Sequence, residues 1–315
     1  MKNKSLTMFV AAILIAVFHL WINVTSMGSV ASGIEDFVQF ICFIGVDMFF
    51  AISAFSIAQS NTENYKEFIK KRFSKIYNKF LLFAIIAFIL ESWTISRLLK
   101  VASGIELFAR GGGSFLWFAP AILIVYLLLP LYKKVDEHYP KASPVFAILL
   151  WLAIGLLLTK LNIARQIFIF YNRIPIVLFG FYMGKYDVLN RIRQSRFRYI
   201  ILALSLMCMG IAFVYFGNYQ SSANRFLYDF FYISGIPLSI GLVMILDILP
   251  KVKIIDSLSR CTFEMYGIQM IFGFKAADII YKNFGSAVFS NIVIIVLLIL
   301  VAFILERIFA NLQRL

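Results

Sequence analysis

Among the ionisable side chains inside the long apolar stretches of this 315-residue chain, six are candidates for a functional role: His19, Asp47, Glu91, Arg173, Glu264 and Asp278. A charge near the centre of a bilayer costs roughly 2.5–3.5 kcal/mol on insertion scales, so each of these residues needs a reason to be there. His19 is the best suited to chemistry, because a neutral imidazole can be buried, takes a proton near pH 7 and can be oriented by a carboxylate. We therefore consider His19 as a general base or acyl relay, with Asp47 as the group that orients it.

Glu91 and Arg173 admit two interpretations. They suit an ion pair that holds two helices in register, because intramembrane charges usually pair, and they equally suit contacts with a polar substrate. Asp278 is expected to pair locally with Lys275, and Glu264, near the inner end of its apolar run, is expected to reach solvent. The sequence leaves both interpretations of Glu91 and Arg173 open.

The composition predicts an integral membrane protein. Hydrophobic residues make up 62% of the chain and charged residues 15%, against roughly 45–50% and about 25% in soluble proteins. About ten spans of about 20 residues would account for this excess. The apolar runs lie roughly at 6–24, 38–60, 79–96, 113–132, 143–160, 167–184, 199–217, 228–249, 261–282 and 287–309. We therefore expect an all-α, polytopic transmembrane helix bundle of about ten spans, forming a single domain over residues 1–315.

The distribution of charge predicts the orientation of this bundle. Most lysines and arginines fall in alternate loops, so the positive-inside rule places both termini in the cytoplasm. The net charge of +14 is explained by this bias, and no nucleic-acid-binding pattern interrupts the apolar runs. Cys42, Cys208 and Cys261 lack the paired spacing of a disulfide framework or a metal site. The lipid bilayer is therefore the expected partner, and abundant Ile, Asn, Lys and Phe hint at the plasma membrane of a low-GC bacterium.

Four of the ionisable residues are predicted to lie at similar depths below the outer surface of the membrane. At about 1.5 Å per residue, His19 lies ~8 Å and Asp47 ~13 Å from the outer ends of their spans, a difference of about 5 Å. Glu91 and Arg173 also fall in the outer half of the membrane. Ser53 follows Asp47 by one and a half helical turns. We expect these side chains to converge on one cavity.

A basic cluster follows the second predicted span and consists of Lys70, Lys71, Arg72 and Lys75. It could serve only as an orientation signal. It also suits the phosphates of an anionic donor that approaches from the cytoplasm. No Walker motif, nucleotide-binding glycine loop, zinc-protease motif or nucleophile elbow occurs in the chain, so neither a nucleotide fold nor a metal is expected.

Six stretches, in order along nearly the whole chain, carry a resemblance to a known family. Each combines apolar residues with a polar landmark, and they lie at 13–19 (ending in His19), 45–55 (GVDMFFAISAF), 68–77, 116–132 (beginning LWFAPA), 173–184 and 261–269 (CTFEMYGIQ). Together they resemble the integral membrane acyltransferase 3 family, whose members commonly move acetyl or other acyl groups onto cell-surface glycans.

The resemblance implies an O-acyltransferase that takes an acyl group from cytoplasmic acyl-CoA, with acetyl-CoA as the expected donor. The acceptor would be a hydroxyl of an extracytoplasmic or lipid-linked glycan. His19 and Asp47 would be catalytic, and the cofactor-binding residues would be Lys70, Lys71, Arg72 and Lys75. The implied substrate-binding residues are Arg173, Ser53, Glu91, Trp117, Tyr266 and Gln269.

The chain departs from the family pattern at three positions. Met8 stands where the family has an arginine eleven positions before the histidine, Ala54 replaces a glycine, and Gln269 replaces a late histidine. A glutamine can still form hydrogen bonds but cannot shuttle a proton. The losses at Met8 and Gln269 support an alternative function, a polysaccharide exporter or flippase-like protein of the same family that transfers no acyl group.

Overall fold

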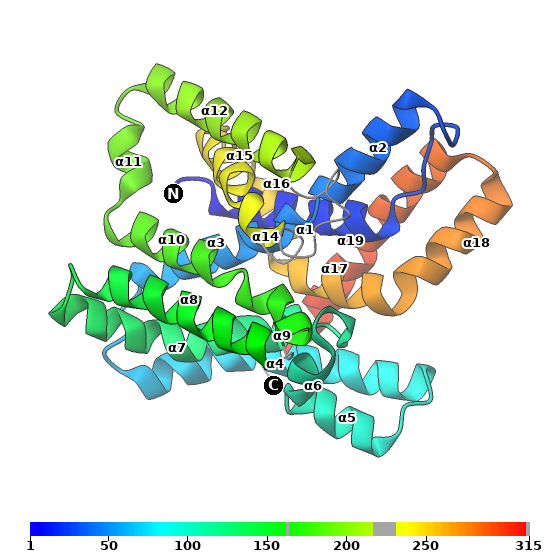
Figure 1. Cartoon of the computed structure of the whole chain (residues 1–315). Coiled ribbons are helices and arrows are strands. Elements are labelled where there is room, and N and C mark those ends of the chain that lie inside the picture. The colour runs from blue at the N-terminus through cyan, green and yellow to red at the C-terminus, as the bar shows by residue number, and fades with distance from the viewer. Residues whose placement is uncertain (162–163, 217–230, 313–315) are drawn as a thin grey trace. The chain divides into compact units, whose positions relative to one another are not determined.

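The structure, a computed structural model, describes residues 1–161, 164–216 and 231–312. Every regular element in these ranges is helical, which confirms the predicted all-α fold class (Figure 1). The first three residues of the predicted span at 228–249, and the last residue of the one at 199–217, lie outside the described residues.

Seven helical stretches in the described part of the chain are long and apolar enough to cross a membrane. They are Val30–Ala58, Tyr65–Leu90, Phe118–His138, Ser143–Lys160, Ile167–Lys185, Arg196–Val214 and Ala287–Asn311. Two shorter apolar helices, Lys4–Leu20 and Ile236–Ile248, also correspond to predicted spans. The total of ten spans and the cytoplasmic position of both termini stay predictions.

The chain folds into two compact units. Unit 1 comprises, among the described residues, 1–49, 197–216 and 235–312, and unit 2 comprises 50–161, 164–196 and 231–234. Helix α3 (Ile44–Ala58) gives its first turns to unit 1 and the rest to unit 2. The single domain predicted for residues 1–315 stays a prediction.

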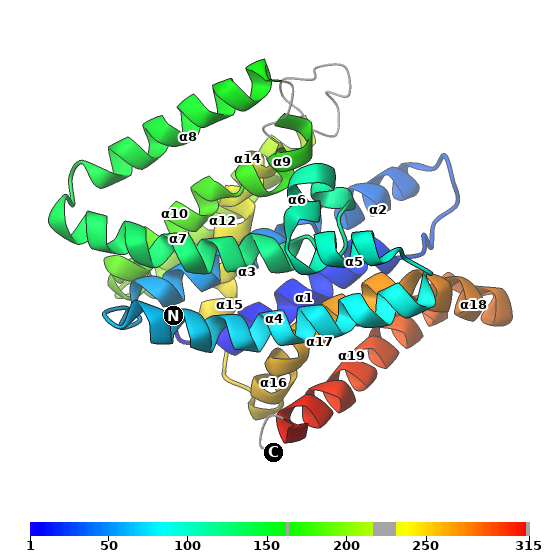
Figure 2. The same ribbon diagram turned by 90° about the horizontal axis from the view of Figure 1, so that it is seen from below.

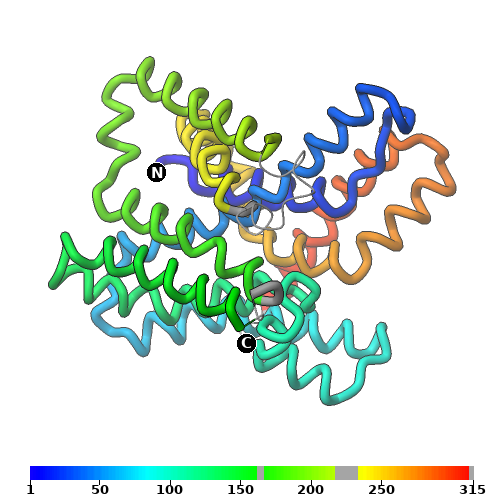
Figure 3. The backbone as a smooth tube through the Cα atoms, in the orientation of Figure 1, coloured from blue at the N-terminus to red at the C-terminus, as the bar shows by residue number. Residues whose placement is uncertain are grey.

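Unit 1 is organised around α1 (Lys4–Leu20), which packs against several later helices. The helices of this unit are α2 (Val30–Ile41), α12 (Arg196–Val214), α15 (Ile236–Ile248), α16 (Lys253–Leu258), η3 (Ser259–Cys261), α17 (Thr262–Ile268), η4 (Gln269–Gly273), α18 (Phe274–Phe284) and α19 (Ala287–Leu312). The tube trace in Figure 3 follows the backbone from α17 through η4 into α18.

Polar side chains fix α1 at both ends. The first amide groups of a helix lack backbone partners, and next to this helix start the carboxylate of Asp247 accepts hydrogen bonds from the backbone N–H groups of Lys2 (2.5 Å) and Asn3 (3.1 Å). Just after its C-terminus, the side-chain amide of Asn291 donates to the carbonyl of Ile22 at 2.8 Å and accepts from its N–H at 2.9 Å. The position of α1 is therefore set by α15 and α19.

Unit 2 is built around the long helix α4 (Tyr65–Leu90), which lies along α7 (Phe118–His138) (Figure 2). Its other helices are α5 (Ile95–Ala102), α6 (Ile105–Arg110), η1 (Gly111–Gly113), α8 (Ser143–Lys160), α9 (Ala164–Tyr171), α10 (Ile174–Lys185), α11 (Val188–Ile192) and α14 (Phe231–Ser234). The side chain of Asn64 caps α4 by accepting from the N–H of Glu67. This helix therefore begins well before the predicted span at 79–96, and the basic cluster lies on it.

A buried carboxylate joins three helices of unit 2. Asp136 on α7 is 0% exposed. It accepts hydrogen bonds from the hydroxyls of Ser143 on α8 (2.5 Å) and Tyr182 on α10 (2.9 Å), and it forms an ion pair with Lys185. A charge can stay buried when such partners surround it. This network fastens α7, α8 and α10 together.

The replacement Asp136→Ala is expected to destabilise unit 2. It leaves Lys185 without its carboxylate and two hydroxyls without their acceptor, which costs ~1–3 kcal/mol. The thermal midpoint of the detergent-solubilised protein should fall by about 5 °C. Glu137→Ala removes the exposed neighbouring carboxylate and serves as the control, with no expected change. Equal midpoints for the two variants would contradict a structural role for Asp136.

Candidate functional site

His19 lies in the last turn of α1 and is half-buried among aromatic rings. Its imidazole meets the ring of Phe18 edge-on, with the centroids 5.0 Å apart, and the ring of Phe274 at 6.2 Å. Phe274 begins α18, directly after η4. The histidine singled out in the sequence therefore faces the late segment of the chain that carries Gln269.

Close packing brings η4 against the end of α1. A Cβ atom built on Gly273 would lie 2.8 Å from Cδ2 of Leu20 and 3.3 Å from Cβ of Gln269. A larger side chain at Gly273 would therefore require the side chain of Leu20 to move. The structure places Gln269 in the neighbourhood of Leu20, the residue that follows His19, across 249 positions of sequence. Tyr266, another predicted substrate-binding residue, is half-buried on the adjoining helix α17.

Asp47 is buried in the first turn of α3, 0% exposed. Its Oδ2 atom lies 3.3 Å from the Cβ position of Gly235, which also faces the ring of Phe43. Among the described residues no hydrogen bond joins Asp47 to His19. The role of Asp47 in orienting the imidazole therefore stays a prediction.

Residues on either side of the turn between α2 and α3 contact α1 at different points along its length. Gln39 on α2 donates from Nε2 to the carbonyl of Phe18 at 3.2 Å, next to His19. Farther along the chain, Met48 packs with Ala11, eight residues before His19. Eight residues correspond to about 12 Å along a helix axis. The chain on either side of this turn therefore contacts α1 at points roughly two helical turns apart.

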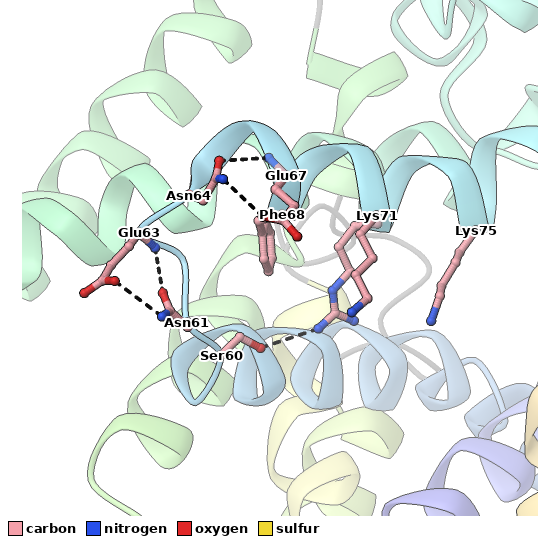
Figure 4. Close-up of a pocket in the computed structure, with 9 residues that line it drawn as sticks. Ser60, Asn61, Glu63, Asn64, Glu67, Phe68, Lys71 and Lys75 are labelled. Carbon is pink, nitrogen blue, oxygen red and sulfur yellow. Dashed lines mark hydrogen bonds between the residues drawn. The ribbon is translucent and has the colours of Figure 1, made fainter.

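Unit 2 contains a cavity of about 510 Å³ where α3 is followed by α4 (Figure 4). The sequence predicts that this end of both helices faces the cytoplasm. Lys71 and Lys75 extend from α4 toward the space between the two helices. The lining residues are mostly polar, and they are Ser60, Asn61, Glu63, Asn64, Glu67, Phe68, Lys71, Arg72 and Lys75.

Three of the four residues predicted to bind the cofactor line this cavity: Lys71, Arg72 and Lys75. Lys70 is exposed and does not line it. Two carboxylates, Glu63 and Glu67, also line the cavity and were not predicted. The three cations outnumber these two anions, so the lining has a net positive charge.

Arg72 connects the cavity to the interior of unit 2. Its guanidinium lies 5.4 Å from the centre of the Phe68 ring and 5.7 Å from that of Tyr126, and its Nη2 atom donates to the hydroxyl of Ser60 at 3.5 Å. The phenol of Tyr126 lies close enough to both Arg72 and Ser53 to interact with each of them. Ser53, predicted from sequence as a substrate-binding residue, therefore lies near the basic cavity through Tyr126, a residue that was not predicted from the sequence.

Lys133 holds the end of α3 beside this cavity. Its ammonium group donates hydrogen bonds to the carbonyl oxygens of Ala58 at 3.0 Å and Ser60 at 2.8 Å. The last carbonyls of a helix have no backbone partners, so a lysine is a suitable cap. The cavity wall formed by Ser60 is fixed in this way to α7.

Arg173 and Trp117, both predicted to bind substrate, lie together in unit 2. The guanidinium of Arg173 is 5.1 Å from the centre of the indole ring, and the residue is only 2% exposed. Its Nη1 atom also donates to the carbonyl of Ile169. A cation stacked on a tryptophan in a buried position is stabilised by the ring's negative face. This arrangement places a fixed positive charge in an apolar interior.

Glu91 is exposed at the C-terminus of α4, where it accepts a hydrogen bond from the indole N–H of Trp93 at 2.8 Å. The buried carboxylate in this part of unit 2 is instead Glu106, 4% exposed, which pairs with Arg97 and Arg110. Glu106 and Arg110 lie four positions apart in the sequence, a spacing from which this ion pair on one helix face could have been predicted.

No group of three metal-ligating side chains lies together in the described ranges.

The comparisons with known proteins give one match. Residues 9–309 match the model of a family described as an acyltransferase domain, acyltransferase 3. No curated protein and no solved structure matches the chain. The match covers nearly all of both units, including His19, the basic cavity and Gln269.

Proposed function

Because the chain belongs to the acyltransferase 3 family, we propose that it is an O-acyltransferase that moves an acyl group, acetyl in the expected case, from cytoplasmic acyl-CoA to a hydroxyl of an extracytoplasmic or lipid-linked glycan. Its family and the seven apolar helices among its described residues make it a multi-pass membrane protein with an acyltransferase-type function. The membrane would be the plasma membrane of a bacterium.

The basic cavity of unit 2 is the observation that carries the proposal. Coenzyme A is a polyanion, and its phosphates are held best by charge-assisted hydrogen bonds from lysine and arginine. Lys71, Arg72 and Lys75 supply these charges from successive turns of one helix, and Asn61 and Asn64 add amide groups. A cavity of about 510 Å³ falls within the size range of small-molecule sites.

His19 is the base in this proposal. As the acceptor hydroxyl oxygen forms a bond to the thioester carbonyl carbon, its proton passes to the imidazole, and the carbonyl π electrons move onto oxygen. The tetrahedral intermediate then collapses, the carbon–sulfur bond breaks and the CoA thiolate takes the proton from His19. Arg173 offers a fixed positive charge for the thioester carbonyl or for an anionic group of a substrate.

Acetyl-CoA binding by the purified protein tests this proposal. We expect micromolar binding by the wild type in titration calorimetry, weakened at least about 100-fold in the variant Lys71→Gln/Arg72→Gln/Lys75→Gln, because three charged hydrogen bonds of ~1.5–3 kcal/mol each are lost.

The matched control is Lys66→Gln/Lys79→Gln/Lys134→Gln, which removes the same charge from α4 and α7 outside the cavity. Its affinity should stay within about threefold of the wild type, because charges outside the cavity act weakly on it at a distance in salt. Absence of binding by folded wild-type protein would contradict the proposal and favour the exporter. Equal weakening in both variants would assign the effect to net charge and contradict a site in the cavity.

A further inference from the structure

Gln269 holds a buried amide nitrogen that has no hydrogen-bond acceptor in the part of the chain that the structure describes. The residue is 1% exposed, and its Nε2 atom has no acceptor among the described residues. Leaving a buried donor unsatisfied costs ~1–3 kcal/mol. An apolar side chain of similar length, such as methionine, would fill the same space without that cost. The position is therefore unfavourable for stability alone.

The backbone at this position is also unusual. Gln269–Gly273 forms a π-helical segment between α17 and α18. Such segments are rare, widen the helix by one residue and are found frequently at functional sites. The widened turn here carries Gln269 at its start and Gly273 at its end, where the glycine allows contact with Leu20. Two independent features, an unpartnered amide and a π-helical turn, therefore coincide beside the end of α1.

Two other side-chain amides near His19 already have hydrogen-bond partners. Gln39 donates to the carbonyl of Phe18, and Asn291 uses both its amide groups on Ile22. The amide of Gln269 differs from these two because its Nε2 group has no acceptor among the described residues and can donate to a substrate. A neutral amide also cannot lose that proton near pH 7, so it donates at any pH at which His19 is a free base.

We infer that Gln269 donates a hydrogen bond from Nε2 to the acyl carbonyl oxygen as that oxygen becomes negative, an assignment that rests on the proposed acyl transfer. His19 accepts the proton of the attacking hydroxyl, and Gln269 stabilises the oxygen that receives the carbonyl electrons. A preorganised donor of this kind acts strongly because it lies in a site that excludes water. Gln269 is thus a catalytic residue in its own right, and glutamine serves at this position without moving a proton.

The test compares turnover with stability in the full-length protein. Gln269→Met is expected to lower kcat about 10²–10³-fold, the usual effect of removing one donor to such an oxygen. The KM for acetyl-CoA and its binding should not change, because the cavity of unit 2 is untouched. The thermal midpoint should stay the same or rise, because methionine removes the unsatisfied donor. Gln269→His, which restores a donor, should recover part of kcat.

The assay follows release of the CoA thiol from acetyl-CoA by protein reconstituted in liposomes, with octyl glucoside as the hydroxyl acceptor. Ser290→Ala is the matched control, because it removes another fully buried, unpartnered polar atom of the same unit, on α19. Its kcat should equal that of the wild type.

The outcomes separate this inference from the function on which it rests. Wild-type protein that neither binds acetyl-CoA nor releases thiol would overturn the proposed function itself. Active wild-type protein with an equally active Gln269→Met variant would overturn only the role of Gln269. A variant that loses thermal stability in proportion to its activity would show a structural amide and would also overturn the inference.

Discussion

Replacing His19 by alanine is expected to abolish acyl transfer while leaving acetyl-CoA binding unchanged. A positioned general base contributes typically 10²–10⁴-fold to the rate, so thiol release should fall to the background of the liposome assay. The imidazole lies in unit 1, against Phe18 and Phe274, whereas the cavity for the donor is formed within unit 2. Binding and turnover therefore depend on different residues and can be lost separately.

The control for this prediction is the second histidine of the chain. His138 is exposed in the last turn of α7, where its Nδ1 atom lies 2.8 Å from the carbonyl oxygen of Lys134. His138→Ala should therefore retain full thiol release. Full transfer by His19→Ala, in protein that binds acetyl-CoA normally, would remove His19 from the mechanism.

The replacement Gly180→Leu is expected to prevent stable folding of unit 2. Gly180 and Gly184 lie one helical turn apart on α10 and face α3, a spacing that allows two membrane helices to approach closely. A Cβ atom on Gly180 would lie 2.8 Å from Cα of Ala51, and one on Gly184 would lie 2.5 Å from the carbonyl oxygen of Phe55. Backbone atoms cannot move aside as a side chain can, so α3 would have to shift.

Overpacking of this kind typically costs 1–3 kcal/mol, and a leucine against backbone is expected to reach or exceed the upper end. The measurements are the yield of monodisperse protein in detergent and its thermal midpoint. Gly33→Ala is the control, because a Cβ at that exposed position in α2 meets nothing within 4 Å, and alanine favours the helix. Normal yield and midpoint for Gly180→Leu would show that α3 and α10 do not pack as described.

The apolar runs predicted most of the helices because lipid requires long apolar surfaces. The predicted span at 143–160 coincides with α8, and the one at 287–309 falls within α19. The start of α4 was not predicted, since apolarity reports only the part of a helix that lies in lipid. Lys, Arg and Glu are good helix formers, so α4 extends through the charged segment back to Tyr65. The expected span at 38–60 is two helices, because the chain turns between Ile41 and Ile44.

The candidate site was predictable where residue type alone carries the signal. Charge pointed to Lys71, Arg72 and Lys75 as candidates, and an imidazole within an apolar run pointed to His19. Tyr126 was not predicted, because a single aromatic residue in an apolar helix carries no distinguishing signal in a chain with 17% aromatics. The unsatisfied donor of Gln269 could not be predicted either, because satisfaction depends on neighbours that only the folded chain brings together.

Lys133 has a consequence for the electrostatics of the cavity. The aligned peptide units of a helix place about half a negative charge at its C-terminal end. Helix α3 ends at Ala58, two residues before the cavity wall at Ser60, so its bare carbonyls would repel an approaching phosphate. The ammonium group of Lys133 covers these carbonyls. The partial negative charge at the C-terminal end of α3 is therefore neutralised by Lys133. An anion in the cavity is attracted by Lys71, Arg72 and Lys75 without repulsion from that helix end.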